Sequence, residues 1–194
     1  MGGLPRERKF SLKELFKATK ELLLINGYEG FTFSLLAERL HVSRGTIYKY
    51  YENKDELISD YMINDMHLFL NDLKAIEQYR EFSEQFDFLL NTILERKEIN
   101  QMILIFAQIP NHTTEKAKRN QEVLFQLHQD MYRYLQSFIE LGKKEEKLKS
   151  HLPDGLILGF IFQSVAIPNH FGITHAEWVQ SIKEMIKDGM FNHL

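Results

Sequence analysis

The chain has 194 residues and a mass of 23.0 kDa, and its 44% hydrophobic and 26% charged residues are typical of a globular protein with a proper core. It contains no cysteine, which excludes disulfides, thiolate catalysis and sulfur-ligated metal sites. The net charge of -3 is unevenly distributed, because residues 1–54 hold ten basic against six acidic residues, a net +4, and the remainder therefore carries -7.

No segment has the length and apolar character of a signal peptide or a membrane span. The longest apolar stretch, 156–167, is too short to cross a bilayer. We therefore expect a soluble cytoplasmic protein with no membrane partner. A basic N-terminal module on an acidic body is the asymmetry expected when one end faces phosphates.

Helical periodicity runs through the whole chain, and no strand-like alternation interrupts it. This predicts an all-α fold. Asn26 and Gly27 mark the end of the first helix, and prolines at 110, 153 and 168 separate the later ones. The predicted helices span about 11–26, 33–40, 44–51, 54–77, 80–97, 100–108, 114–144, 154–169 and 175–190.

Residues 32–54 predict two short helices joined by a tight turn. Thr32 caps the first helix, in which the small Ala37 lets the second helix cross closely. In the turn, Val42 is the apolar plug and His41 takes a left-handed conformation at some cost, before Ser43 caps the second helix.

The second helix of the pair has the pattern of a recognition helix. Ile47 and Tyr51, four residues apart, form its buried face. Gly45 costs about 1 kcal/mol of helix propensity relative to alanine. A glycine in the first turn makes sense if that turn must approach something closely, as recognition helices approach base edges in the major groove.

These residues resemble the DNA-binding domain of TetR-family transcriptional regulators. The resemblance covers about sixty residues and is carried by Thr32, Ala37, Val42, Ser43, Arg44, Gly45, Thr46, Tyr48, Tyr51, Lys54 and Leu57. His41 departs from the family's usual glycine, and Leu35 from an acidic residue that often completes a capping box. The resemblance implies an N-terminal three-helix helix-turn-helix DNA-binding domain, 1–53, and a helical regulatory and dimerisation domain, 54–194.

The expected partner is a double-stranded DNA operator. Arg44, Gly45 and Thr46 are the candidates for reading bases, because arginine donates twice to guanine and the other two allow close approach to a thymine methyl. The candidates for holding phosphates are Thr32, Tyr48, Lys49, Tyr50 and Lys54. For each residue, the alternative is an ordinary exposed helix position.

The last two predicted helices carry more apolar surface than one core needs. Residues 156–167 are apolar almost all round, and 175–190 carry a stripe that includes Trp178, Ile182 and Ile186. In a two-fold homodimer these helices would form a four-helix bundle, as the resemblance also implies. A purely intramolecular core is the alternative.

The resemblance further implies a small-molecule effector bound in the C-terminal domain. Candidate ligand-binding residues are the aromatic and polar side chains Phe86, Phe106, Phe125, His128, Tyr132 and Phe162. From the residues alone, a filled core made of these side chains is the favoured alternative.

No pattern in the sequence indicates catalysis, a cofactor or a metal. Histidine pairs with ligand-like spacing are few, and His170 and His175 fall around a helix break; no phosphate loop, nucleophile elbow or zinc-binding helix motif occurs. We therefore expect a repressor relieved by its effector, not an enzyme. The alternatives are a dimeric DNA-architectural or protein-interaction module without an inducer, and an enzyme with a helical pocket.

Overall fold

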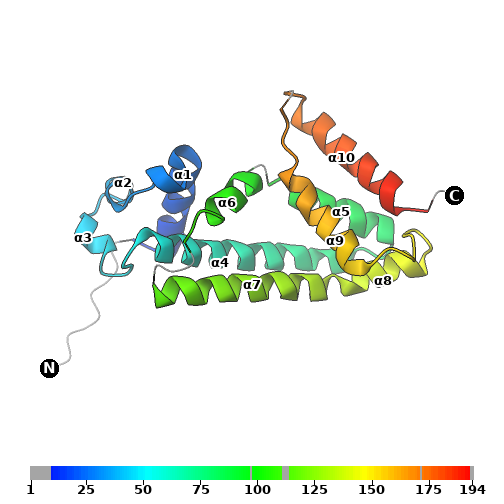
Figure 1. The fold of residues 1–194 in the computed structure, drawn as a ribbon, viewed down its shortest axis with the longest axis horizontal. Helices are drawn as coiled ribbons and strands as arrows, with labels where there is room; N and C mark the ends of the chain where they lie inside the picture. Colours follow the sequence, from blue (N-terminus) through cyan, green and yellow to red (C-terminus); the bar gives the residue numbers. More distant parts are fainter. Residues whose placement is uncertain (1–9, 97, 111–113, 171, 193–194) are drawn as a thin grey trace. The chain divides into compact units, whose positions relative to one another are not determined.

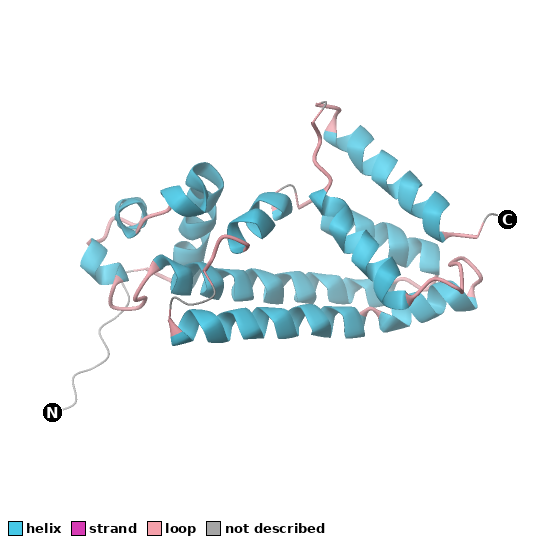
Figure 2. Ribbon diagram, viewed as in Figure 1, coloured by secondary structure: helices cyan, strands magenta, loops and turns pink. Residues whose placement is uncertain are grey.

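The structure is a computed structural model that describes residues 10–96, 98–110, 114–170 and 172–192. Helices connected by loops make up these described ranges, which contain no strand, so the predicted all-α fold is confirmed (Figures 1 and 2). The α-helices are α1 Leu12–Gly30, α2 Phe33–Arg39, α3 Arg44–Ile47, α4 Lys54–Leu73, α5 Phe82–Leu94, α6 Ile99–Phe106, α7 Glu115–Tyr134, α8 Gln136–Lys144, α9 Asp154–Gln163 and α10 His175–Met190. Two 3-10 helices, η1 and η2, span Lys74–Gln78 and Ser164–Ala166.

Several predicted helices are shorter or broken in the structure. The one predicted over 54–77 ends as α-helix at Leu73 and continues as η1, and the one predicted over 80–97 spans only Phe82–Leu94. The helix predicted over 114–144 divides at Leu135 into α7 and α8. The helix predicted over 154–169 ends at Gln163, where the Ser164 hydroxyl donates to the Ile161 carbonyl at 2.7 Å. Ile167 is extended, as the residue before a proline must usually be.

The first compact unit combines the described residues up to Asp65 with those of 101–124. Helix α1 begins with a capping box, in which Ser11 and Glu14 satisfy each other's backbone amides, and its helical conformation breaks at Gly27, which has φ 66°. The core of this unit is apolar and comes from α1, α2, α3, α6 and the first part of α4. Its fully buried side chains include Leu15, Leu23, Phe31, Leu36, Ile47, Leu57 and Ile58.

The second compact unit combines the described residues of 66–100 with those of 125–194. Phenylalanine rings form its centre: Phe82 stacks on Phe138 at 4.8 Å between ring centroids, and Phe86 meets Phe191 edge-on at 4.8 Å. Helices α5, α8, α9 and α10 supply most of this core. These units group residues by packing, so the functional boundary expected after Asn53 stays a prediction.

Candidate nucleic-acid interface

Helix α2 starts where the sequence predicts. Thr32 is its N-cap, and the Thr32 hydroxyl accepts a hydrogen bond from the Leu35 amide at 3.3 Å. Leu36 and Ala37 are buried on the face that meets the core. The predicted cap and the predicted small contact residue are therefore confirmed.

The turn after α2 is tight and left-handed. His41 has φ 53°, as predicted, and the Val42 amide donates to the Ala37 carbonyl at 2.9 Å. Val42 is half-buried and packs against the core of the first unit. The chain therefore passes from this turn directly into α3.

Helix α3 is shorter than predicted, because regular helix ends at Ile47 and not at Tyr51. The Tyr51 amide still donates to the Ile47 carbonyl at 3.2 Å, so one further helical turn follows, and Ile47 and Tyr51 are both buried as predicted. Ser43 is the N-cap by position, but its hydroxyl pairs with the Thr46 hydroxyl at 2.9 Å and does not cap a backbone amide.

Six of the predicted DNA-binding residues lie in α3 and the turn after it. The exposed ones are Arg44, Gly45, Tyr48 and Lys49, and the half-buried ones are Thr46 and Tyr50. A Cβ atom added at Gly45 would meet only the Ser43 hydroxyl, at 4.0 Å. The fold therefore has room for a side chain at this position. Because glycine has none, a binding partner can come close to the backbone of this turn.

Lys54 has a structural role that sequence reasoning missed. Its ammonium group donates to the Tyr28 carbonyl at 2.7 Å and lies 3.9 Å from the centroid of the Tyr28 ring. The Glu29 carboxylate is 4.0 Å away. Lys54 thus ties the first turn of α4 to the end of α1, and its predicted contact with a phosphate is not needed to explain it.

Buried polar groups fix the start of α4 to its neighbours within the first unit. Glu56, which is 6% exposed, accepts a hydrogen bond from the Thr114 hydroxyl at 2.8 Å. Asp60 accepts one from Lys116 at 2.8 Å and one from Asn120 at 2.6 Å. These contacts join α4 to the first two turns of α7. No local sequence pattern indicates these contacts, because the partners are 56 to 60 residues apart.

Comparisons with known proteins match this geometry. The family model "Bacterial regulatory proteins, tetR family" matches residues 15–61, which include α2, the turn and α3. The regulator YhgD of Bacillus subtilis, described as an uncharacterized HTH-type transcriptional regulator, is 30% identical over 134 residues, or 66% of each chain.

This chain belongs to the TetR family. Another uncharacterized HTH-type transcriptional regulator, from Haemophilus influenzae, is 34% identical over 83 residues, which cover 42% of this chain and 44% of that relative. The matches thus span 44% and 66% of these two relatives' lengths. The structure of FadR from Bacillus subtilis in complex with stearoyl-CoA has a TM-score of 0.69 at 16% identity, covering 92% of this chain and 99% of that one.

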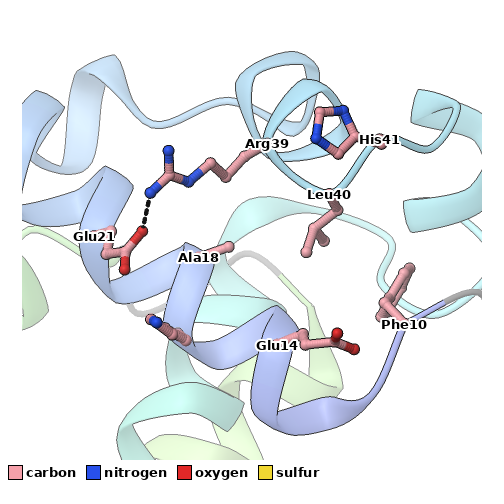
Figure 3. A pocket seen from close by; sticks show the side chains of 8 residues that line it. Phe10, Glu14, Ala18, Glu21, Arg39, Leu40 and His41 are labelled. Carbon is pink, nitrogen blue, oxygen red and sulfur yellow. Dashed lines mark hydrogen bonds and ion pairs between the residues drawn. The ribbon is translucent and has the colours of Figure 1, made fainter.

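An open depression of about 300 Å³ lies between α1 and the end of α2 of this TetR-family chain (Figure 3). Its lining mixes both signs of charge, and Arg39 already pairs with Glu21 across it. The residues that line it are Phe10, Glu14, Lys17, Ala18, Glu21, Arg39, Leu40 and His41. The two carboxylates in this lining would repel a phosphate group, so the depression is poorly suited to bind one.

The six predicted ligand-binding residues differ in burial and belong to two units. Tyr132 and Phe162 have adjacent rings, 5.7 Å apart, and are half-buried in the second unit. Phe86 is fully buried in the same core, whereas Phe125 is 66% exposed and His128 is also exposed. Phe106 lies in the other unit. Their role in ligand binding stays a prediction.

Helices α9 and α10 of this TetR-family chain leave large apolar side chains in solvent. Leu156, Phe160 and Met185 are 59%, 48% and 64% exposed, although the opposite faces of both helices are buried in the core. Among the described residues, no helix has the length and hydropathy to cross a membrane, and no group of three potential metal-ligating side chains occurs.

Proposed function

We propose that this chain is a sequence-specific DNA-binding transcriptional regulator and acts as a repressor. The observation that carries the proposal is the exposed first turn of α3, where Arg44 is followed by a glycine that the fold does not require. Arg44 would donate twice to a guanine, with Gly45 and Thr46 close to neighbouring bases. The candidate phosphate contacts are Thr32, Tyr48, Lys49, Tyr50 and Lys54. Such a regulator would act in the cytoplasm and would not be an enzyme.

A homodimer through α9 and α10 would place two α3 helices on a near-palindromic operator. The exposed Leu156, Phe160 and Met185 support this proposal, since association would remove them from water. Sedimentation of Phe160→Lys should give a monomer where the wild type gives a dimer. Ile25→Lys is the matched control, because Ile25 is 79% exposed on α1, and it should remain dimeric. A monomeric wild type would contradict the proposal.

The effector would be a small molecule bound in the C-terminal unit, near the adjacent rings of Tyr132 and Phe162. It would relieve repression only by binding the free arrangement of the dimer more tightly than the operator-bound one. Stearoyl-CoA is the first ligand to test, because a FadR of the same fold has been solved with it. An effector that left operator affinity unchanged would contradict this mechanism.

The decisive experiment is selection of random duplex DNA by the purified wild type, Arg44→Ala and Arg133→Ala. Arg133 is an exposed arginine on α7 and controls for the lost charge. The wild type and Arg133→Ala should enrich the same palindrome, and Arg44→Ala should lose it, with a cost of about 1–3 kcal/mol in specific binding. Binding without sequence preference in the wild type would favour the architectural alternative.

A further inference from the structure

Arg44, Tyr48 and Phe33 form a continuous stack on the surface of the first unit. The Arg44 guanidinium carbon lies 5.5 Å from the centroid of the Tyr48 ring. The Tyr48 ring in turn meets the Phe33 ring edge-on, at 5.0 Å between centroids and 70° between planes. Phe33 is 5% exposed, at the start of α2, so the stack rests on the core.

Backbone geometry aligns two members of the stack, Arg44 and Tyr48. The Tyr48 amide donates to the Arg44 carbonyl at 3.2 Å, which places the two side chains one helical turn apart on the same face. Tyr48 is 49% exposed, yet its ring is fixed from below by Phe33. A large aromatic side chain is thus kept on the surface in contact with Arg44.

A stack of this kind limits the freedom of the arginine without using its hydrogen bonds. An exposed arginine loses much side-chain entropy when it makes a bidentate contact. A guanidinium packed against an aromatic ring keeps its N–H groups at the rim, where they stay available to an acceptor in the same plane.

We propose that Tyr48 is a positioning residue for base reading: its ring, seated on Phe33, holds the Arg44 guanidinium ready for a guanine edge. The proposal rests on the proposed function and deepens it, because it assigns part of the sequence preference to a ring that need not touch a base. The ring would position Arg44 and the phenolic oxygen would contact a phosphate, so the ring and the hydroxyl have separable roles.

Removal of the ring and removal of the hydroxyl distinguish these roles. Tyr48→Phe keeps the ring and should retain the wild-type preference at the base that Arg44 reads. Tyr48→Leu removes the ring and should weaken the preference at that base by about two- to fivefold, the size of an exposed cation–π contact. Phe33→Leu should weaken the same preference, since it removes the aromatic ring against which Tyr48 packs.

The test is a cycle of four proteins, namely wild type, Tyr48→Leu, Arg44→Ala and the double variant, each measured on the selected operator and on an operator changed at the one base. In the Arg44→Ala background, Tyr48→Leu should cause no further loss of discrimination. A merely structural role of Tyr48 would lower binding to both operators alike, so the ratio of the two affinities is the deciding quantity.

Three outcomes would overturn the inference alone: an unchanged ratio in Tyr48→Leu, an equal loss in the Arg44→Ala background, or a Tyr48→Phe variant as poor as Tyr48→Leu. A wild type without any sequence preference would overturn the proposed function together with it. The free protein offers a second readout, because the Arg44 Nε–H resonance should lie upfield from the ring current of Tyr48. It should move downfield in Tyr48→Leu, while the resonance of Arg133 stays in place.

Discussion

The phenolic oxygen of Tyr28, near the end of α1, donates a 2.6 Å hydrogen bond to the Asp55 carboxylate in the first turn of α4. Both side chains are buried. Burial raises the pKa of the Tyr28 phenol far above its usual value of 10, and the hydrogen bond to Asp55 raises it further. The phenol therefore stays protonated and remains a donor throughout the physiological pH range.

Tyr28→Phe should lower the free energy of unfolding by about 1–3 kcal/mol, because it takes a donor away from a buried carboxylate. Urea denaturation followed by circular dichroism measures this change. The matched control is Tyr134→Phe, which removes a 2.8 Å hydrogen bond to Glu77 at an exposed pair and should cost less, about 0.5 kcal/mol. Equal losses in the two variants would show that the Tyr28–Asp55 bond has no special role.

His41 occupies a left-handed position, φ 53°, in the turn between α2 and α3. His41→Gly should raise the free energy of unfolding by about 0.5–1 kcal/mol, because glycine adopts this conformation without a Cβ penalty. His41→Ala keeps the penalty and should bring no gain. Thermal denaturation of both variants makes the comparison, and a gain as large in His41→Ala would mean that the side chain, and not the backbone, is responsible.

Local features of this chain were predictable from sequence, and long-range partners were not. The Thr32 cap and the left-handed His41 depend only on neighbouring residues and were predicted correctly. Lys54 binds the Tyr28 carbonyl, 26 residues away, and no local pattern encodes that contact. Likewise, sequence reasoning assigned Phe106 to a ligand cavity or a filled core, but it could not show which of the two cores Phe106 packs against.

The Asp154 carboxylate in the first turn of α9 makes the stability of the folded protein depend on pH. Hydrogen bonds from Lys143 at 2.6 Å and from Gln136 at 2.7 Å lower the pKa of this carboxyl below its ordinary value of 3.8. A carboxyl with a depressed pKa in the folded state stabilises the protein above pH 3.8, and this stability is lost as the pH falls through the folded pKa.

Asp154→Asn should therefore be less stable than the wild type at neutral pH, with a difference that shrinks below pH 3.8. Unfolding by urea across the acidic range gives the two curves. Lys143→Met provides the control, because it removes the first of the two donors and should flatten the same part of the wild-type pH dependence. Parallel curves for wild type and Asp154→Asn would contradict the linkage.

The close packing of α8 on α5 in the second unit depends on the absence of a side chain at Gly142. A Cβ atom there would lie 2.6 Å from the Phe82 ring and 2.7 Å from a Leu148 methyl group, both buried. Gly142→Ala should thus lower the free energy of unfolding by about 1–3 kcal/mol through overpacking, although alanine is the better helix former.

Gly189→Ala in α10 separates packing from helix propensity, because an added Cβ atom there meets nothing within 4 Å. It should raise the free energy of unfolding by about 0.5–1 kcal/mol. Chemical denaturation of the two variants should thus give changes of opposite sign from the same substitution. A stabilising Gly142→Ala would mean that Phe82 and Leu148 move aside without loss, and that the helices do not need their close approach at this point.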